Sequence, residues 1–162
     1  MTSLLPTMQI EPIDLRSGVN VEVSFSKATL ASSTRFNALI VTVNGTTGIG
    51  CRSNADASYI EFMTRAALRL IFPTSLVFDF RDFEYEWGDG MARTLSAGEN
   101  LYIDDDLPVA IVVSDLCRKG LTSLVRDELF SDPGAWLFDS LDAALAALEV
   151  RVESKRQSPP SP

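Results

Sequence analysis

The sequence predicts an α/β fold in which an N-terminal β-hairpin is followed by βαβ units. Residues 19–25 alternate apolar and polar side chains, which is the pattern of a half-buried strand. Two apolar runs, at residues 75–80 and 108–113, are typical of strands that are buried on both faces of a parallel sheet. Segments with helical spacing separate these runs, so we expect a mostly parallel or mixed sheet of four or five strands with about four helices.

The predicted hairpin joins the first two strands. The alternating strand at 19–25 is followed by a polar turn at 31–35 and by an apolar strand at 38–43. These strands are close enough in sequence to pair in antiparallel orientation. Residues 1–17 include two prolines and show no sustained periodicity, so we expect them to form a loose arm.

A glycine- and threonine-rich loop at 45–53 leads into the first predicted helix. Asp56 or Ser58 is placed to cap this helix, and Glu61 would complete a capping box with Ser58. Pro73 ends the helix because proline cannot continue the hydrogen-bond ladder. The apolar residues that recur at spacings of three and four are Tyr59, Ile60, Phe62, Met63, Ala66, Ala67, Leu70 and Ile71.

Two helices are expected after the first long apolar run. A short one extends from about Asp89 to Leu95 and ends near Gly98. The next begins at a cap formed by Asp115, although Gly120 lowers its helical propensity. Its inward-facing side chains are Leu116, Leu121, Leu124, Val125 and Leu129.

The C-terminal part contains one more strand and one more helix. Residues 135–138 form a short strand, and Ser140 caps the last helix. The apolar stripe of that helix is Leu141, Leu145, Leu148 and Val152. We therefore place a single domain at 18–153 and a disordered tail, rich in proline and serine, at 154–162.

The charge of the chain limits the partners that it can bind. Its 162 residues carry a formal net charge of −8, with a sequence pI of about 4.5. This charge repels the phosphates of nucleic acids and anionic lipids, so we expect neither nucleic acid nor a membrane as a partner. The charge would favour a basic protein surface, although many acidic proteins are simply soluble.

The composition also limits the chemistry. The sequence contains no histidine, which is the commonest general base and the commonest metal ligand. Two cysteines, Cys51 and Cys117, do not suggest a disulfide framework, and a buried structural cysteine is the commoner role. No signal peptide or membrane-spanning run is visible, so we expect a cytoplasmic location of bacterial type.

Two patterns in the sequence could indicate ligand binding, and each also has a simpler interpretation. Residues 45–50 have the spacing of a phosphate-binding loop, but Cys51 stands where the lysine is required, so a flexible connector is the better interpretation. Several acidic residues could hold Mg²⁺ or Ca²⁺, or could form a solvated surface. They are Asp82, Glu84, Glu86, Asp89, Asp104, Asp105 and Asp106. We predict no catalytic residue, no cofactor and no metal site.

Four segments together carry a family resemblance. They are Val-Thr-Val-Asn-Gly at 41–45, Leu-Val-Phe-Asp-Phe-Arg-Asp-Phe at 76–83, Leu-Pro-Val-Ala-Ile-Val-Val at 107–113 and Leu-Phe-Asp-Ser-Leu-Asp-Ala-Ala-Leu at 137–145. In their order and intervals, residues 36–150 resemble the STAS domain, the fold of bacterial anti-sigma-factor antagonists and of sulfate-transporter tails. The resemblance implies a non-enzymatic regulatory domain that acts by binding a protein partner.

The resemblance also locates a functional turn. The turn that carries the family's phosphorylated serine falls on Trp87-Gly88-Asp89-Gly90, where Gly90 is retained and Asp89 stands at the serine position. A serine kinase does not phosphorylate aspartate, so the resemblance implies a degenerate turn without the phosphorylation switch. The carboxylate of Asp89 would still suit the N-terminus of the helix that follows.

We expect the partner-binding surface at this acidic turn. Its residues are Glu84, Tyr85, Glu86, Trp87, Asp89 and Met91. Buried aromatic anchors would supply affinity, and the acidic groups would raise the association rate. In the alternative interpretation, Trp87 packs under the second helix and the acidic groups are solvated.

Two other functions stay open at this point. A small, acidic chain without catalytic residues also fits an immunity protein or inhibitor that neutralises a basic toxin or nuclease. A crotonase-like, ClpP-like or metal-dependent enzyme is the third possibility. The sequence does not indicate the oligomeric state.

Overall fold

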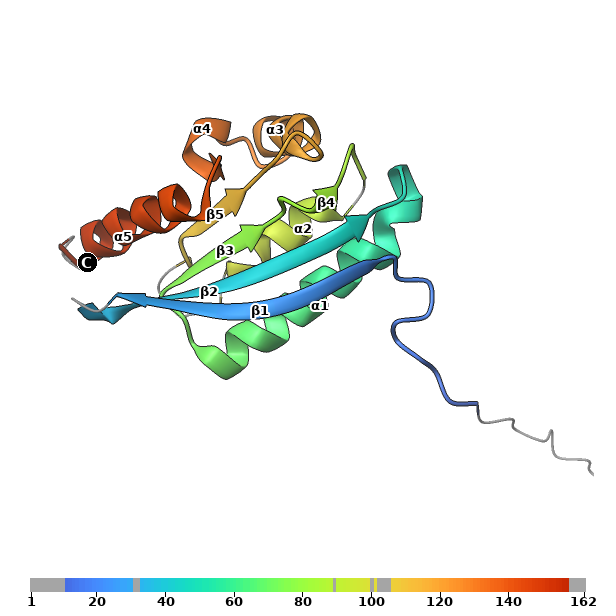
Figure 1. The fold of residues 1–162 in the computed structure, drawn as a ribbon, viewed down its shortest axis with the longest axis horizontal. Coiled ribbons are helices and arrows are strands. Elements are labelled where there is room, and N and C mark those ends of the chain that lie inside the picture. Colours follow the sequence, from blue (N-terminus) through green and yellow to red (C-terminus); the bar gives the residue numbers. More distant parts are fainter. Residues whose placement is uncertain (1–10, 31–32, 89, 100, 102–105, 158–162) are drawn as a thin grey trace, which may run out of the picture.

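The fold is a mixed sheet of six strands with helices on both faces (Figure 1). The computed structural model describes residues 11–30, 33–88, 90–99, 101 and 106–157. The strand order is β1-β2-β3-β5-β6, and β4 pairs with β2 beside this path. The predicted α/β class, with an N-terminal hairpin and a mostly parallel sheet, is confirmed.

The strands are β1 (Val21–Leu30), β2 (Ser33–Thr46), β3 (Ser75–Asp79), β4 (Phe83–Glu84), β5 (Val109–Val112) and β6 (Leu137–Phe138). The helices are α1 (Asn54–Ile71), α2 (Met91–Leu95), α3 (Arg118–Asp127), α4 (Pro133–Trp136) and α5 (Leu141–Gln157). Two short 3₁₀ helices occupy Gly50–Ser53 and Ser96–Gly98.

The pairing of the strands follows the predicted order. β1 and β2 form an antiparallel hairpin, with Val23 opposite Val43. β2, β3, β5 and β6 are parallel, and Phe78 of β3 lies opposite both Val41 of β2 and Ile111 of β5. Phe78 and Ile111 are completely buried, as expected for central strands that helices cover on both faces.

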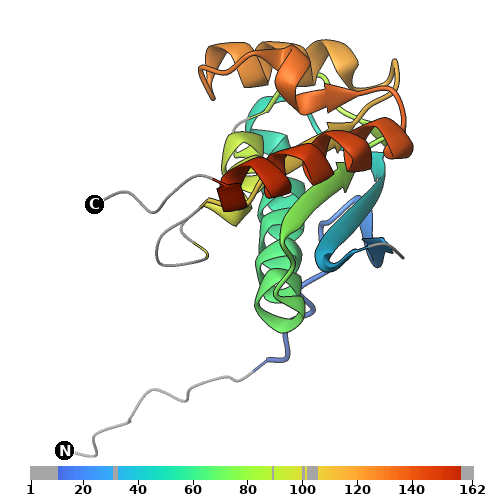
Figure 2. The same cartoon turned by 90° about the vertical axis from the view of Figure 1, so that its left-hand side faces the viewer.

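Alternate residues of the central strands form two apolar clusters, one on each face of the sheet. The larger cluster joins Val41, Phe78 and Ile111 to apolar residues of α1, α2 and α3. The smaller cluster joins the intervening strand residues, such as Val77 and Val112, to Ala144, Leu148 and Val152 of α5. Figure 2 shows α5, in red, crossing the strands on its own side. The predicted stripe of the last helix is therefore confirmed as a core-facing stripe.

α1 begins earlier than expected. Its N-cap is Ser53, whose side chain makes no cap hydrogen bond, so neither Asp56 nor Ser58 is the cap and that prediction is wrong. Asp56 is instead completely buried in the first turn, where its Oδ1 accepts a hydrogen bond of 2.7 Å from the backbone N–H of Asn20. The helix ends at Ile71, and Phe72 takes a left-handed conformation before Pro73.

The helix after β5 also begins differently. α3 starts at Arg118 with Cys117 as its N-cap, so Asp115 does not cap it. Leu116 precedes the helix and is 52% exposed, so its predicted inward position is wrong. Leu121, Leu124 and Val125 are buried as expected.

The C-terminal strand is shorter than predicted, because a turn of helix occupies its first positions. Pro133 starts α4, and the side chain of Asp132 accepts a hydrogen bond of 3.0 Å from the N–H of Gly134. Ser140 caps α5 as expected by accepting from the N–H of Ala143. α5 continues to Gln157, past the expected domain end at 153. The described helices include none with both the length and the apolar character of a membrane-spanning helix.

Candidate partner-binding surface

The predicted partner-binding residues follow β3 at the carboxyl edge of the parallel strands. β3 ends at Asp79, and the chain then forms the two-residue strand β4. Phe83 and Glu84 of β4 pair in parallel with Gly45 and Thr46 at the end of β2. The hydroxyl of Thr46 donates a hydrogen bond of 2.9 Å to Glu84 Oε2. The acidic segment is thus held to the sheet rather than forming a free loop.

Tyr85 lies inside the domain. Its side chain is 3% exposed, and its ring stacks on Phe83 with a centroid distance of 6.1 Å and an interplanar angle of 12°. Phe83 continues a row of aromatic contacts through Phe80 to Phe78. Tyr85 therefore anchors the acidic segment to the core and does not offer its ring to a partner.

The backbone that follows Tyr85 is fixed by the start of α3. The N–H of Tyr85 donates to the carbonyl of Leu116 at 3.2 Å. Gly120 of α3 packs so closely that a β-carbon there would stand 2.8 Å from the Tyr85 carbonyl oxygen and nearer still to that of Glu86. The glycine that weakened the helix prediction is therefore the residue that lets α3 approach this segment.

Trp87 lies over Gly50 and is 57% exposed. A β-carbon at Gly50 would stand 2.9 Å from Cη2 of the indole, and the N–H of Gly50 donates to the Trp87 carbonyl at 3.4 Å. The adjacent Gly88 is buried against Ser53, whose Cβ would be 2.8 Å from an added β-carbon. The ring rests on Gly50, before α1, and is more than half exposed, so Trp87 is not buried under α2. The exposure of Glu84 and Glu86 agrees with the other part of that alternative, in which the acidic groups are solvated.

The glycine-rich connector has a role that its sequence pattern did not indicate. Gly50 has a φ of 63°, which few residues other than glycine adopt, and it leaves room for the indole of Trp87. Spacing alone associated residues 45–50 with phosphate binding or with a flexible link. No local pattern pairs these residues with Trp87, since the contact depends on tertiary structure.

The last two predicted residues do not add to an accessible surface. Met91, the first residue of α2, is 1% exposed and belongs to the larger apolar cluster. Asp89 lies outside the described residues, as do Asp104 and Asp105. Gly90, which precedes α2, has a φ of 102° and so requires the conformational freedom of glycine.

The accessible part of the predicted set is Glu84, Glu86 and Trp87. Two exposed apolar side chains flank them in the fold: Ile49, next to Gly50 and 53% exposed, and Leu116, whose carbonyl binds Tyr85. We call these five residues the carboxyl-edge surface: Ile49, Glu84, Glu86, Trp87 and Leu116. Sequence reasoning missed Ile49 and assigned Leu116 to the core. An isolated apolar residue in a loop gives no signal of its own.

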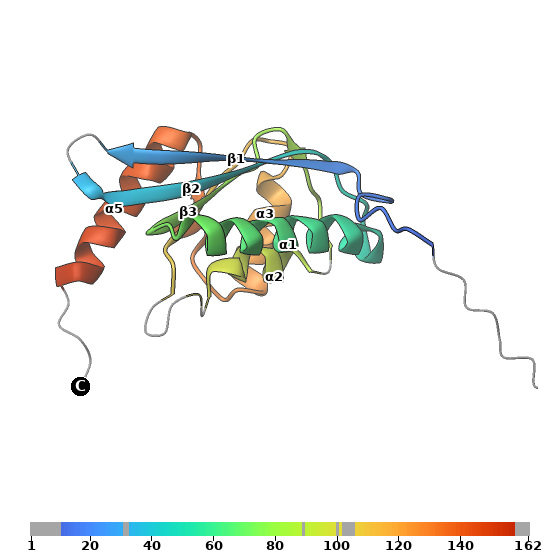
Figure 3. The same ribbon diagram turned by 90° about the horizontal axis from the view of Figure 1, so that it is seen from below.

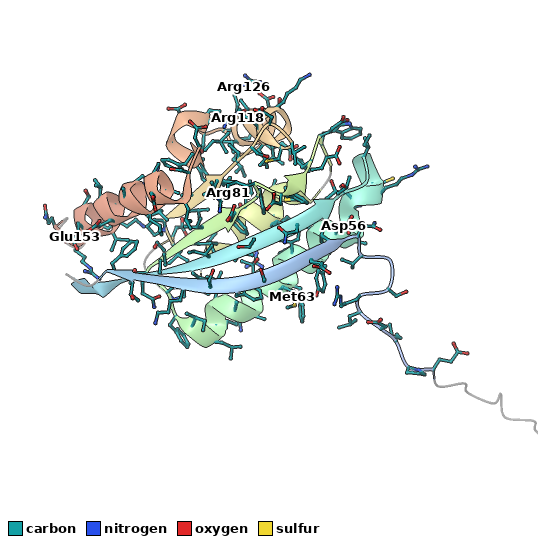
Figure 4. All side chains as sticks on the ribbon, in the orientation of Figure 1. Asp56, Met63, Arg81, Arg118, Arg126 and Glu153 are labelled. Carbon is teal, nitrogen blue, oxygen red and sulfur yellow. The ribbon has the colours of Figure 1, made fainter. Side chains whose placement is uncertain are left out.

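A charged pair marks the end of β3 next to this surface. Asp79 accepts two hydrogen bonds from the Arg81 guanidinium, at 2.9 and 2.8 Å (Figure 4 labels Arg81). These bonds lower the pKa of the Asp79 carboxyl group below its ordinary value, against the opposing effect of burial. The hydroxyl of Ser114 donates to the Arg81 carbonyl at 2.7 Å, which ties the turn to the end of β5.

The surroundings of the two cysteines and of the acidic side chains bear on nucleophilic and metal chemistry. Cys117 is 1% exposed, and burial raises the pKa of its thiol, which donates to the carbonyl of Phe80 at 3.3 Å. A buried thiol with a raised pKa is a poor nucleophile. Cys51 is exposed and unpaired by disulfide. Within the described ranges, no group of three or more acidic or cysteine side chains is placed to hold a metal ion.

Comparison with known proteins identifies the fold. No family model matches the chain, and no curated protein matches it in sequence. An anti-sigma factor antagonist from Mycobacterium paratuberculosis superposes with a TM-score of 0.50 at 17% sequence identity, covering 79% of this chain and 95% of that one. The anti-sigma factor antagonist SpoIIAA, in its unphosphorylated form, gives a TM-score of 0.40 at 13% identity, covering 83% and 100%. The chain has the STAS-like fold that the sequence predicted.

Proposed function

We propose that the chain is a regulatory protein-interaction domain that binds a protein partner through the carboxyl-edge surface. The observation that carries the proposal is Trp87, which is 57% exposed, whose carbonyl accepts a hydrogen bond from Gly50, and which lies between the buried Tyr85 and Gly88. A large aromatic side chain on a fixed backbone loses little conformational entropy when a partner covers it. Indole rings are also among the side chains that most often dominate binding energy.

The acidic groups on this surface suit a basic partner. Glu84 and Glu86 are exposed on either side of the buried Tyr85. Charges at the rim of an interface mainly accelerate association and make it depend on salt concentration. We therefore expect affinity from Trp87, Ile49 and Leu116, and a salt-dependent association rate from the two glutamates.

The partner that fits this fold best is an anti-sigma-type regulator, since the M. paratuberculosis structure of the same fold is an anti-sigma factor antagonist. The absence of histidine and the buried thiol of Cys117 both favour a binding role over catalysis. Asp89, at the position of the family's phosphorylated serine, leads us to propose that a serine kinase does not control this turn.

Affinity capture from the native host, followed by quantitative mass spectrometry, tests the proposal. Wild-type protein should enrich a partner. The Trp87→Ala variant should lose this partner, and the Glu84→Lys, Glu86→Lys double variant should bind it more slowly. Matched controls are Phe130→Ala, which removes another exposed aromatic ring, and Glu149→Lys with Glu153→Lys on α5. Unchanged affinity and salt dependence in both surface variants would exclude this surface as the binding site.

A further inference from the structure

α1 carries two apolar stripes, one that is buried in the core and a second that touches the core through the partly buried Tyr59. The core stripe includes Ala57, Ile60 and Leu68, which are all buried. At the helical repeat, a second set of apolar residues falls within an adjacent arc of about 100°. We call it the outer stripe: Tyr59, Phe62, Met63, Ala66 and Leu70. Phe62 and Leu70 are 60% and 79% exposed. These apolar side chains are far more exposed than is usual for a helix that packs only against its own core.

The outer stripe lies on the flank of α1 that α2 does not cover. The opposite flank of α1 is occupied by α2 and the turn after it. There Glu61 pairs with Arg93, the Thr94 hydroxyl donates to the Ala57 carbonyl, and Arg65 donates to the Ala97 carbonyl. Figure 3 shows α2 on one side of α1 and the hairpin strands on the other, and Figure 4 places Met63 below β1. Met63 therefore lies on the flank of α1 that faces the hairpin, and the outer stripe that includes it lies away from α2.

β1 is the edge strand on this side and has few features that discourage pairing. It is the first strand in the sheet order, so within the described residues β2 pairs with one of its sides and no strand pairs with the other. It is ten residues long and contains no proline, and its register with β2 shifts only between Thr29 and Leu30. Its charged residues are Glu22 and Lys27. Long, regular edge strands are ready templates for pairing with another strand.

The best occupant of this edge is a strand with a specific pattern. Apolar side chains must alternate toward the α1 face, where they would meet the outer stripe, and polar side chains must point to the other face. β1 itself has this pattern. Val21 and Val23 lie on the α1 face with the larger apolar cluster, Phe25 continues them at 39% exposure, and the residues between are Glu22, Ser24 and Ser26.

We propose that two copies of the chain pair through antiparallel β1 strands to form one continuous sheet. A two-fold axis perpendicular to the sheet keeps both α1 helices on the same face, so that their outer stripes cover one another. Centring the axis on Phe25 sets the two Phe25 side chains opposite each other and Val23 opposite Lys27 of the second copy. It also keeps like charges several residues apart. The carboxyl-edge surface is not used in this pairing.

Sedimentation equilibrium of the full chain, from micromolar to submillimolar concentration, tests the association. Wild type should approach twice the 17.7 kDa chain mass with rising concentration. Phe62→Glu with Leu70→Glu places charges on the outer stripe and should weaken association by at least about tenfold. Both positions are exposed, so circular dichroism should be unchanged. Val150→Glu, at an exposed apolar position of α5, should associate like wild type.

Cysteine cross-linking tests the register in a Cys51→Ser background. Directly opposed residues in an antiparallel pair have Cα atoms about 4.5–5.5 Å apart, which suits a disulfide. Phe25→Cys should therefore form an intermolecular disulfide on mild oxidation. Lys27→Cys should not, because the two copies of that residue would be staggered by roughly 13 Å along the strands.

Each of three results would overturn the proposal. They are a wild-type chain that is monomeric at all concentrations, undiminished association of the charged double variant, and equal cross-linking of the two cysteine variants. In a monomeric wild type, slow exchange of the β1 amides that do not bond to β2 would show that another segment of the same chain covers the edge.

Discussion

The carbonyl carbon of Glu86 lies 2.8 Å from the point where a β-carbon on Gly120 would stand. Gly120 is inside α3, where its propensity is poor, and Glu86 is on the segment that presents the carboxyl-edge surface. Glycine at this position therefore lowers the intrinsic stability of α3 but allows the helix backbone to contact that segment closely.

Gly120→Ala should therefore destabilise the protein, although alanine is the better helix former by about 1 kcal/mol. Forcing a methyl group against backbone costs up to about 3 kcal/mol, so we expect a net loss of about 2 kcal/mol in urea unfolding. Gly134→Ala is the matched control, because its nearest neighbour would be Asp132 Oδ1 at 3.4 Å. A Gly120→Ala protein as stable as wild type would show that the segment after Tyr85 can shift to accommodate the added methyl group.

Phe78→Ala should be among the most damaging single changes. Phe78 is completely buried between β2 and β5, with its ring 5.3 Å from that of Phe80. A cavity left by removing such a ring costs about 3–5 kcal/mol. Phe130→Ala, at a ring that is 88% exposed, should change the free energy of unfolding by less than about 0.5 kcal/mol. Similar values for the two variants would mean that the central strands are not packed as described.

The Asp79–Arg81 pair should make stability depend on pH in the acidic range. The pKa of Asp79 is lower in the folded state, so the folded chain holds this proton less tightly than the unfolded chain. The stabilisation is therefore fully present above the ordinary carboxyl pKa of 3.8 and is lost as the pH falls through the lower, folded-state value. Asp79→Asn should flatten this part of the profile measured by thermal unfolding.

Asp115→Asn, which removes an exposed carboxylate near the same edge, is the control for that profile. We expect it to keep the acid-induced loss of stability seen in wild type. An Asp79→Asn protein with the full wild-type loss would assign the effect to other carboxyl groups.

The two thiols should differ in reactivity. Cys51 is exposed, whereas Cys117 is buried with a raised pKa. An aromatic disulfide reagent should therefore titrate one thiol rapidly in the native protein and the second only after denaturation. Cys51→Ser should abolish the rapid phase. Rapid modification of Cys117 in that variant would show that the start of α3 opens readily.

The sequence predicted the elements whose own residues determine them. The paired apolar runs around Phe78 and Ile111 located the central strands, and Ser140 marked the start of α5. The errors fall where a distant segment decides the outcome. Asp56 has the chemistry of a cap, but it accepts a hydrogen bond from the backbone N–H of Asn20. Leu116 lies in the turn before α3, where its carbonyl accepts a hydrogen bond from the N–H of Tyr85.

The candidate surface was also predicted only in part, because some of its residues are positioned by tertiary contacts. The exposed positions of Glu84, Glu86 and Trp87 followed from an acidic turn that could be seen in the sequence. The burial of Tyr85 and Met91 did not, because an aromatic or apolar residue in such a turn suits an interface or a core equally well. Only the row of rings from Phe78 and the packing of α2 distinguish the two cases.

The two apolar clusters are unequal, and the sheet separates them. α5 contributes Ala144, Leu148 and Val152 to the smaller cluster, while α1, α2 and α3 share the larger one. Detachment of α5 would expose only one face of the central strands and leave the aromatic row, and the carboxyl-edge surface that it supports, in place. We therefore expect amide exchange or proteolysis to reveal partial opening at the C-terminal helix, while the carboxyl-edge surface keeps its shape.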